Sequence, residues 1–495
     1  MQRMDAPVKR ESHDSHADNV PLVVDLDGTL LCTDLFQEST LRLIKQKPWL
    51  LLVIPFWLFK GRAFLKRWVF QRVRIETSLL PLNKELLAWL KEEKAQGRRL
   101  ILATASDYDQ ARSVVEPLGL FDTVMGSDGR RNLKGRNKLQ SIVEQCGGPF
   151  DYAGNSSADL KIWRGCRQAV LVNAPRRVEN AARRAVPVAR VFSPPAAGLW
   201  NPLRAMRWHQ WVKNLLVFVP AITSHTIFHA AIAGRATLAF LSFCFCASAA
   251  YILNDLLDLE EDRRHSTKTH RPFAAGRTSI GTGLLLALLC LCASAAIAVF
   301  LPLAFMTGLG VYFGLTCLYS LYLKRLLAVD VLTLALLYTL RVVAGSLATG
   351  IVLSLWLLSF AFFLFLSLAF GKRTAELMQQ QQNNRKEVPG RGYVISDLDA
   401  VSTAGICSGF LAALILALYT NSDSVQLLYR RPVLLWGLQP VLLYYVTRFW
   451  VICKRGDLME DPIQYTVREP STYGAASLAV LVLLAATFDF PLFGW

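Results

Sequence analysis

Long apolar runs in the second half of the chain most strongly constrain its fold. Beyond about residue 200, hydrophobic stretches of roughly 20 residues recur, and each is long enough to cross a hydrocarbon core ~30 Å thick. Nine such spans are expected, near residues 213–229, 236–254, 282–301, 304–322, 327–349, 353–371, 401–420, 433–452 and 474–493. We therefore expect an all-α polytopic membrane domain with nine transmembrane helices over residues 200–495.

Lys and Arg are unevenly distributed between the connections that join these spans. They gather in residues 255–281, 323–326, 372–400 and 453–473. Because Lys and Arg favour the cytoplasmic side, we expect these connections in the cytoplasm and the chain in the inner membrane. The net charge of +17 therefore reflects membrane topology and anionic ligands. The sequence has no basic stripe interleaved with aromatics of the kind that binds nucleic acid, so no nucleic-acid partner is expected.

The first 200 residues have the composition of a soluble protein. Residues 1–19 contain no apolar stretch, which predicts a disordered tail rather than a signal peptide. Residues 20–195 mix short apolar runs with charged segments, which predicts a separate α/β domain in the cytoplasm. The ten cysteines show no metal-binding or redox spacing and are interpreted as small buried apolar residues.

A short apolar strand ending in two aspartates opens this α/β domain. The sequence PLVVDLDGTLL, residues 21–31, carries Asp25 and Asp27. Since side chains alternate along a strand, both aspartates lie on one face at its carboxyl end, where open α/β sheets place their sites. A second buried strand, LILATAS at residues 100–106, contains Thr104.

Two later segments complete a series of motifs. KGRNKLQ contains Lys138, and YAGNSSAD contains Asn155 and Asp159. DxDGT followed by these segments in this order resembles the haloacid dehalogenase (HAD) superfamily of phosphohydrolases, which implies a Rossmann-like sheet, phosphatase activity and Mg²⁺. The resemblance implies these metal ligands: Asp25, Asp27, Asn155 and Asp159.

The same resemblance implies a role for each motif residue. Asp25 is expected to be the nucleophile that forms an aspartyl-phosphate, and Asp27 the general acid/base. Thr104 and Lys138 are expected to hold the phosphoryl oxygens. One departure is Asn155, where the family usually has Asp, so one negative charge is lost at the metal site. An active phosphatase and an inactive scaffold with the same fold both remain open.

An aromatic and basic segment lies between the first two motifs. The apolar core of residues 47–72, KPWLLLVIPFWLFKGRAFLKRWVFQR, is too short and too interrupted by Pro55 to span a bilayer. Their position makes them part of the HAD cap, expected near residues 35–95. Trp49 and Trp57 with flanking Lys and Arg favour a cap that rests on the membrane surface. The alternative is an ordinary cap core.

The strongest polar feature of the second half is YILNDLLDLEEDRRHSTKTHRPFAAG, residues 251–276. If residues 254–262 are helical, Asp255, Asp258 and Asp262 fall within a ~60° sector of one helix face. Crowded carboxylates repel one another unless a cation lies between them. Mg²⁺ that carries a phosphorylated substrate is the natural partner, because it prefers oxygen ligands. A solvated acidic helix end is the alternative.

NDxxDxxxD at Asn254, Asp255, Asp258 and Asp262 resembles the first aspartate-rich motif of the UbiA family of intramembrane prenyltransferases. The aromatic prenyltransferases of that family have a second DxxxD motif, which this sequence lacks after the fourth expected helix. In its place stand YSLYLKR, residues 319–325, and then Asp330 and Arg341.

This pattern resembles one branch of the family, the decaprenyl-phosphate phosphoribosyltransferases. Four further segments carry the resemblance: HQWVKN at residues 209–214, HRPFAAG at 270–276, GKRTAE at 371–376 and Asp461-Pro462. The branch implies that phosphoribosyl pyrophosphate (PRPP) is the donor and that a polyprenyl phosphate in the lipid bilayer is the acceptor. The HAD domain is then expected to remove the 5-phosphate of the product.

PRPP is highly anionic, so its site needs Mg²⁺ and several cations. Lys213 and Arg341 are the strongest candidates, because ionisable groups in apolar spans are costly and usually functional. The other residues expected to bind substrate are Asn214, Asn254, Arg263, Lys268, Arg271, Tyr319, Lys324, Asp330, Lys372 and Arg373. The three aspartates Asp255, Asp258 and Asp262 are expected to act in catalysis by binding the metal.

Two other functions remain open. One is an aromatic prenyltransferase of the UbiA type, with a 4-hydroxybenzoate-like acceptor and an accessory HAD domain. The missing second DxxxD motif argues against it. The other is a non-catalytic membrane scaffold, against which the aspartate motif argues.

Overall fold

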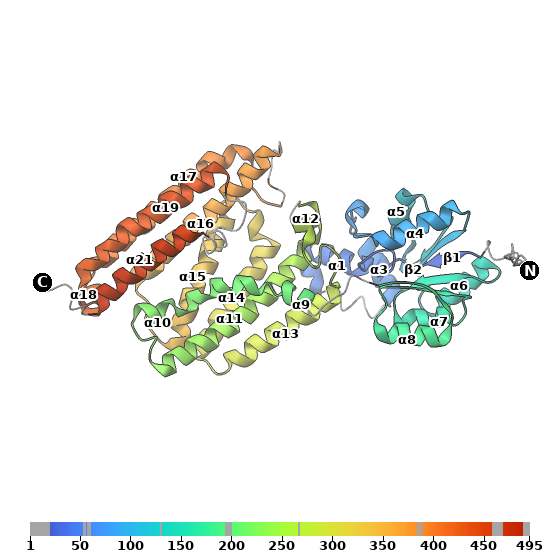
Figure 1. Ribbon diagram of the computed structural model, residues 1–495, viewed down its shortest axis with the longest axis horizontal. Helices are drawn as coiled ribbons and strands as arrows, with labels where there is room; N and C mark the ends of the chain where they lie inside the picture. Colours follow the sequence, from blue (N-terminus) through green and yellow to red (C-terminus); the bar gives the residue numbers. More distant parts are fainter. Residues whose placement is uncertain are drawn as a thin grey trace, which may run out of the picture. The chain divides into compact units, whose positions relative to one another are not determined.

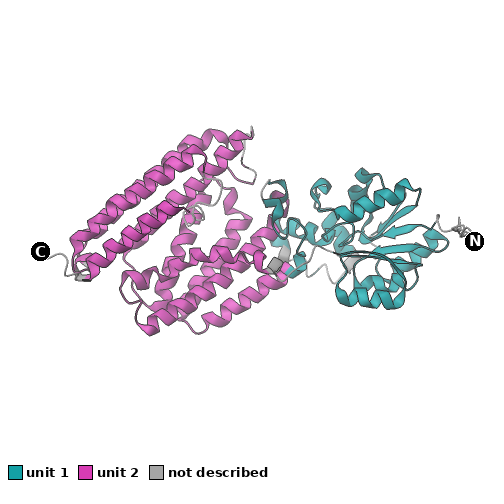
Figure 2. Ribbon diagram, viewed as in Figure 1, with its two compact units in different colours: residues 1–201, 262–282 teal, residues 202–261, 283–495 magenta. Residues whose placement is uncertain are grey.

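A computed structural model describes residues 20–52, 56, 61–128, 131–193, 200–265, 268–383, 388, 390–457 and 469–488. The chain divides into two compact units (Figure 2). Unit 1 is Met1–Asn201 together with Asp262–Thr282, and unit 2 is Pro202–Glu261 together with Gly283–Trp495. The expected tail, residues 1–19, lies outside the described residues. The segment that begins at the third aspartate of the NDxxDxxxD motif, Asp262, thus belongs with the N-terminal unit.

Unit 1 contains a six-stranded parallel sheet in the order β3-β2-β1-β4-β5-β6 (Figure 1). Its strands are β1 Leu22–Val24, β2 Leu100–Asp107, β3 Thr123–Ser127, β4 Asp151–Gly154, β5 Ala169–Val172 and β6 Val188–Phe192. β1 is central, and its Leu22 pairs with Leu100 of β2 and Asp151 of β4. The loops after β1, β2 and β4 therefore leave the same edge of the sheet, and the expected α/β fold with a parallel sheet is confirmed.

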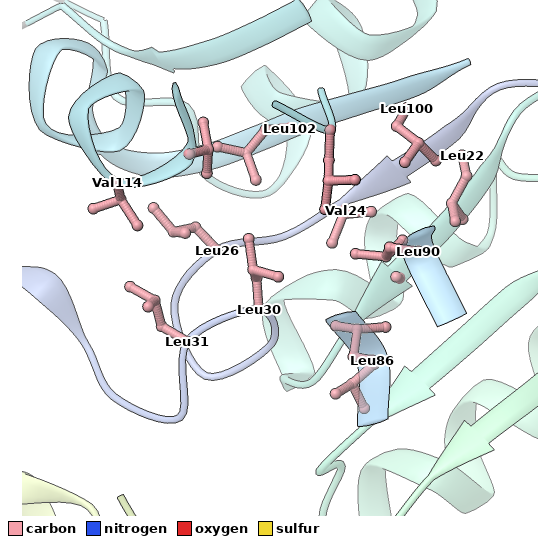
Figure 3. Close-up of a cluster of buried hydrophobic side chains, with 14 of the residues drawn as sticks. Leu22, Val24, Leu26, Leu30, Leu31, Leu86, Leu90, Leu100, Leu102 and Val114 are labelled. Atoms are coloured by element: carbon pink, nitrogen blue, oxygen red, sulfur yellow. The ribbon is translucent and has the colours of Figure 1, made fainter. Parts of the chain in front are cut away.

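Helices cover both faces of the sheet because its strands are apolar on both sides. Leu22 and Val24 pack with α4 and α5 on one face (Figure 3), and Val23 packs with α6, α7 and α8 on the other. The helices of unit 1 are α1 Leu35–Gln46, α3 Arg62–Phe70, α4 Lys84–Ala95, α5 Tyr108–Val115, α6 Arg136–Cys146, α7 Leu160–Trp163 and α8 Arg176–Ala185. Short 3-10 turns occur at η2 Pro48–Leu52, η3 Thr77–Leu79, η4 Glu116–Leu118 and η5 Ser157–Asp159.

The region expected as a cap divides between two cores. α1 and α3 share a small core of their own that includes Leu43, Leu65 and Val69, whereas α4 packs on the sheet. Trp49 is 61% exposed and Phe56 is 71% exposed. Trp57 lies outside the described residues. Membrane contact by this region stays a prediction.

Unit 2 is helical. Seven helices among the described residues are long and apolar enough to cross a membrane: α11 Ala230–Leu257, α13 Ile280–Ala298, α14 Leu303–Leu321, α15 Val329–Thr349, α16 Leu355–Gln382, the helical stretch Ile395–Thr420, which contains η9 Ile395–Asp397 and α17 Leu398–Thr420, and α21 Pro470–Thr487. The remaining elements are α9 Trp200–Ala205, η6 Trp208–Phe218, α10 Val219–Thr223, α12 Leu259–Arg264, η7 Lys268–His270, η8 Leu323–Arg325, α18 Asp423–Leu428, η10 Pro432–Gly437 and α19 Leu438–Arg455. α12 runs across the division between the units, and η7 and the first residues of α13 belong to unit 1.

The expected nine spans are not confirmed in the described part of the chain. The span near 213–229 is broken into η6 and the short α10, which has Pro220 in its first turn. The span near 433–452 begins as η10 and continues as α19, which carries Arg448, Lys454 and Arg455. The expected loop at 372–400 also differs, because α16 continues to Gln382 and places GKRTAE on a helix.

Candidate functional site

In unit 1 the first candidate site lies just after β1. Asp25 is 9% exposed, and its Oδ1 lies 2.7 Å from Nζ of Lys138, a buried residue in the first turn of α6. Burial raises the pKa of Asp25 to about 7, although the Lys138 ammonium opposes this shift. The structure thus brings together two residues that the sequence separates by more than a hundred positions.

Asp27 is held by three donors. Oδ1 accepts a hydrogen bond from the backbone N of Leu35 at 2.9 Å, at the start of α1. Oδ2 accepts from Ser106 Oγ at 2.6 Å and from Thr104 Oγ1 at 3.3 Å. Thr104 was expected to hold a phosphoryl oxygen, and here its hydroxyl is fully buried against Asp27. Ser106 was not expected, although it belongs to the same LILATAS strand.

Asp159 anchors the loop after β4. Its Oδ2 accepts hydrogen bonds from the backbone N of Asn155 and of Ser156 and from Ser156 Oγ, at 3.2, 2.9 and 2.8 Å. Its Oδ1 accepts a hydrogen bond from the hydroxyl of Tyr152 at 2.8 Å. The Tyr152 hydroxyl in turn accepts one from Lys138 Nζ at 2.7 Å. Burial beside carboxylates raises the pKa of Tyr152 well above its usual range. Tyr152 was missed because tyrosine in a strand ordinarily indicates core.

Asn155 faces the turn that carries the two aspartates. A Cβ added at Gly28 would lie 2.0 Å from Asn155 Nδ2, so the amide packs directly against that turn. Asp25, Asp27 and Asn155 therefore offer carboxylate and amide oxygens of the kind that Mg²⁺ prefers, and this donor set fits the metal. Asp159 already accepts four hydrogen bonds from the chain, so its metal-binding role stays a prediction.

In unit 2, two aspartates of the NDxxDxxxD motif are each paired with a basic residue. Asp258 Oδ1 and Oδ2 lie 2.6 and 2.7 Å from Nζ of Lys324, in η8, and both side chains are largely buried. Asp255, 2% exposed, receives two hydrogen bonds from Arg207, with Nε to Oδ2 at 3.1 Å and Nη2 to Oδ1 at 2.5 Å. Each carboxylate is thus neutralised by a cation from elsewhere in the chain.

Arg207 was missed by the sequence reasoning, although it lies two residues before HQWVKN. Its φ is +51°, in the left-handed region that costs a residue with a side chain about 1–3 kcal/mol. Such strain persists only where the surrounding structure enforces it, and it clusters at functional sites. The backbone conformation therefore supports a role for Arg207 beside Asp255.

Asp262 lies in unit 1, and its Oδ2 is 2.6 Å from Nη1 of Arg271. α11 ends at Leu257 and α12 begins at Leu259, so the helix is interrupted at Asp258 within the expected stripe. The three aspartates were expected on one helix face, and that alignment requires a continuous helix from residue 254 to 262. Among the described residues, no three Asp, Glu, His or Cys side chains gather as a metal site would require. Asp255 and Asp258 still supply the hard oxygen donors that suit Mg²⁺.

Arg341 is buried in α15 and surrounded by polar and aromatic partners. Nε donates to Asn214 Oδ1 at 3.0 Å, Nη2 to the Tyr312 hydroxyl at 2.9 Å and Nη1 to the Leu337 carbonyl at 2.6 Å. Lys213 is also buried, with Nζ 5.8 Å from the centre of the Tyr338 ring, which Arg341 also faces. The structure thus brings Lys213, Asn214 and Arg341 into one neighbourhood.

A second buried group surrounds Asp330. Its Oδ2 lies 2.6 Å from Nε of Arg373, and its Oδ1 accepts a hydrogen bond from the Tyr393 hydroxyl at 2.5 Å. The Tyr319 hydroxyl accepts from Arg373 at 3.2 Å and from Arg391 at 2.8 Å. Arg373 is also paired with Glu376 on the next turn of α16. Three expected residues, Tyr319, Asp330 and Arg373, are therefore in contact, and Arg391 was not expected.

The remaining expected residues are placed as follows. Asn254, Lys268 and Lys372 are each half-buried. Arg263 lies in unit 1, where it is paired with Glu38 at 2.7 Å. Asp461 and Pro462 lie outside the described residues.

Comparison with known proteins identifies the family of the second half of the chain. Residues 216–453 match the UbiA prenyltransferase family. A protein of Sinorhizobium fredii described as uncharacterized is 36% identical over 472 residues, 94% of this chain and 91% of that one. Nodulation protein NoeC of Azorhizobium caulinodans is 33% identical over 279 residues, 54% of this chain and 87% of that one.

A third relative is the decaprenyl-phosphate phosphoribosyltransferase of Corynebacterium glutamicum, 36% identical over 188 residues. The match covers 37% of this chain and 57% of that protein. Among solved structures, a UbiA homologue from Archaeoglobus fulgidus bound to GPP and Mg²⁺ covers 58% of this chain and 98% of its own, at 18% identity and a TM-score of 0.44. The family match and the long relatives show that the chain belongs, through its C-terminal half, to the UbiA prenyltransferase family of membrane transferases.

Proposed function

We propose that unit 2 transfers the 5-phosphoribosyl group of PRPP to a polyprenyl phosphate at the cytoplasmic face of the inner membrane. The observation that carries the proposal is the pairing of Asp255 with Arg207 and of Asp258 with Lys324. A diphosphate bound with Mg²⁺ needs both carboxylates and cations, and these two pairs supply both. The similarity to decaprenyl-phosphate phosphoribosyltransferases favours PRPP as the source of that diphosphate.

In this proposal the ion pairs exchange partners when the donor binds. Asp255 and Asp258 would hold Mg²⁺, and Arg207 and Lys324 would donate to phosphate oxygens, so each buried charge would keep a partner. Mg²⁺ would stabilise the negative charge of the leaving pyrophosphate. The bond between ribose C1 and pyrophosphate breaks, and a bond from C1 to an oxygen of the lipid phosphate forms. The lipid phosphate is the nucleophile, so the protein contributes mainly positioning and charge stabilisation.

The buried cations deeper in unit 2 are proposed to hold the second phosphate group. Lys213 and Arg341 lie among aromatic rings that exclude water, which strengthens their attraction for an anion. The group formed by Tyr319, Asp330 and Arg373 is proposed to support the same site by fixing the start of α15 against α16. Lys372 on α16 adds a further basic group of unit 2. Lys268 and Arg271 belong to unit 1, and their role in donor binding stays a prediction.

Unit 1 is proposed to act on the product as a HAD phosphatase. The phosphoribosyl lipid carries a 5-phosphate monoester, which Asp25 attacks to form an aspartyl-phosphate while Asp27 protonates the leaving hydroxyl. Lys138 neutralises Asp25 and the phosphoryl oxygens. Water then releases inorganic phosphate from Asp25 with Asp27 as base. The expected domains are accordingly residues 20–195 for the phosphatase and 200–495 for the transferase.

The proposal is tested by isotope transfer in membranes that contain the full-length protein. Ribose-labelled PRPP and polyprenyl phosphate should give a labelled lipid when Mg²⁺ is present. An Asp258→Asn variant should give none, because it loses a metal ligand and the ion pair with Lys324. If label from a prenyl diphosphate instead moves to 4-hydroxybenzoate, the chain is an aromatic prenyltransferase and the proposal is wrong.

A further inference from the structure

A tight turn at residues 388–391 of unit 2 carries Arg391, which the sequence reasoning did not single out. The sequence Val-Pro-Gly-Arg is typical of a type II turn, whose third residue has a positive φ. Gly390 has a φ of +74°, and the backbone N of Arg391 donates to the carbonyl of Val388 at 3.2 Å. The backbone N of Val388 donates in turn to the carbonyl of Tyr393 at 3.2 Å. These bonds fix where the backbone of Arg391 lies.

The residues that follow this turn pack against η8. A Cβ added at Gly392 would lie 2.6 Å from the carbonyl oxygen of Arg325, so only glycine fits there without a shift of the backbone. The Tyr393 hydroxyl accepts a hydrogen bond from the backbone N of Ala328 at 3.2 Å, just beyond η8. These contacts hold the turn against the short helix whose middle residue is Lys324.

The same turn lies beside α12, the helix that follows Asp258. A Cβ added at Gly390 would lie 4.0 Å from Cγ of Glu261, which is an ordinary packing distance. Gly390 and Gly392 therefore lie against residues that follow each partner of the buried Asp258–Lys324 pair in the chain. All of these residues belong to unit 2.

The side chain of Arg391 is only weakly held. Its Nη1 donates to the Tyr319 hydroxyl at 2.8 Å and lies 3.8 Å from Oδ2 of Asp330, and it has no further hydrogen bond or ion pair to the described residues. Asp330 is already bound by Arg373 and by the Tyr393 hydroxyl. Arg391 is 18% exposed, whereas Arg373 is 1% exposed. Arg391 can therefore turn to another anion without leaving Asp330 as an uncompensated buried charge.

The Tyr319 hydroxyl adds a second donor at this place. It accepts hydrogen bonds from both Arg373 and Arg391, and no described residue accepts its own O–H. A hydroxyl can donate one hydrogen bond besides those it accepts. Lys372 brings a further positive charge near this hydroxyl. Donors and positive charge gathered in this way suit an anion, because charge-assisted hydrogen bonds are the strong ones.

We propose that Arg391 is a further substrate-binding residue of the transferase and that, with Lys324, it binds the pyrophosphate group of the donor. A guanidinium donates two parallel hydrogen bonds to phosphate oxygens, which a lysine ammonium cannot do. Tyr319 is the positioning residue that orients this guanidinium. The inference rests on the proposed transfer from PRPP.

The experiment uses the full-length protein in detergent and two measurements. The first is the Kd for inorganic pyrophosphate in the presence of Mg²⁺, measured by titration calorimetry. The second is kcat/KM for transfer from PRPP to polyprenyl phosphate. Arg391→Gln should raise the Kd and lower kcat/KM, each by about tenfold or more, because a charge-assisted hydrogen bond is lost. Arg391→Lys, which keeps the charge but not the fork, should lie between Arg391→Gln and the wild type.

Two further variants serve as controls. Arg455→Gln removes the same charge from an exposed position at the end of α19 and should match the wild type in both measurements. Tyr319→Phe, which keeps the ring and removes the hydroxyl, should raise the Kd by about threefold or more. It should have no further effect in the Arg391→Gln background, because the two residues act as a unit. Additive effects would overturn the positioning role of Tyr319.

A Kd unchanged in Arg391→Gln overturns the proposal, even if kcat/KM falls, because Arg391 would then not hold the pyrophosphate. Absence of pyrophosphate binding in the wild type overturns it as well. If the wild type transfers no ribose phosphate, the proposed function fails. The pyrophosphate affinities then decide separately: equal values in Arg391→Gln and Arg455→Gln overturn the Arg391 site, and a higher Kd in Arg391→Gln alone supports it.

Discussion

At the scale of single residues, paired charges rather than isolated ones define both candidate sites. Lys138 with Asp25, Lys324 with Asp258 and Arg207 with Asp255 are each held at hydrogen-bonding distance in largely buried surroundings. Buried pairs of this kind are weak contributors to stability, since desolvation offsets their attraction. Their occurrence at three positions of two motifs therefore favours function over stability as their reason.

Lys324→Ala should lower transfer from PRPP at least about a hundredfold, because it removes a donor to phosphate and leaves Asp258 buried without this partner. Initial rates with labelled PRPP measure the effect. Arg235→Ala, which removes an exposed basic residue of α11, should leave the rate unchanged. A Lys324→Ala variant with full activity would contradict the assignment of Lys324 to the donor site.

Tyr152→Phe should loosen the loop after β4, because the lost hydroxyl bridges Lys138 and Asp159. Leaving these buried groups unsatisfied costs about 1–3 kcal/mol. Hydrogen exchange measured by mass spectrometry on the full-length protein should show faster exchange over residues 151–163 than in the wild type. Residues 169–172 of β5 serve as the reference, and equal acceleration there would indicate general destabilisation instead.

At the scale of elements, the sequence predicts strands and spans better than the places where they break. The run before Asp25 and the run that contains Thr104 were expected as strands and form β1 and β2, because apolar residues in a buried parallel sheet leave a clear pattern. The break between α11 and α12 at Asp258 could not be expected. It accompanies the contact of Asp258 with Lys324, a residue 66 positions away, and periodicity carries only local information.

The turn after β1 has no room for a methyl group at Gly28. Gly28 has a φ of +76°, and Gly28→Ala would both strain the backbone and press on the Asn155 amide. We expect phosphatase turnover of the phosphoribosyl lipid to fall about tenfold or more, with transfer unchanged. Gly148→Ala, at a glycine with open space around it, is the control and should have no effect. Equal activity in both variants would place the Gly28 turn outside the site.

At the scale of the whole molecule, the proposed reactions are consecutive. The first makes a lipid with a phosphomonoester, and the second removes that phosphate. The contacts described for Asp255 and Asp258 lie within unit 2, and those described for Asp25 lie within unit 1. The two activities should therefore be separable by substitution in the intact chain.

Asp25→Asn should stop the second reaction alone, because an amide cannot form the acyl-phosphate. Membranes with this variant should accumulate the phosphorylated ribosyl lipid, whereas the wild type should yield the dephosphorylated one. Thin-layer separation of the labelled lipids, before and after treatment with an added phosphatase, distinguishes the two products. An identical product from wild type and variant would show that unit 1 does not act on this lipid.

The inclusion of residues 262–282 in unit 1 predicts how truncated forms of the protein behave. Glu38 and Cys32 belong to the first two hundred residues, but Arg263, which pairs with Glu38, and Gly276, which packs against Cys32, lie beyond them. A truncation near residue 200 would remove the counter-ion of buried Glu38 and the residues that pack against Cys32 from the N-terminal fragment. Such a gene fragment should express as an aggregation-prone protein, and supplying residues 262–282 in the same reading frame should restore its solubility. The N-terminal unit is therefore completed by a segment that the second half of the chain supplies.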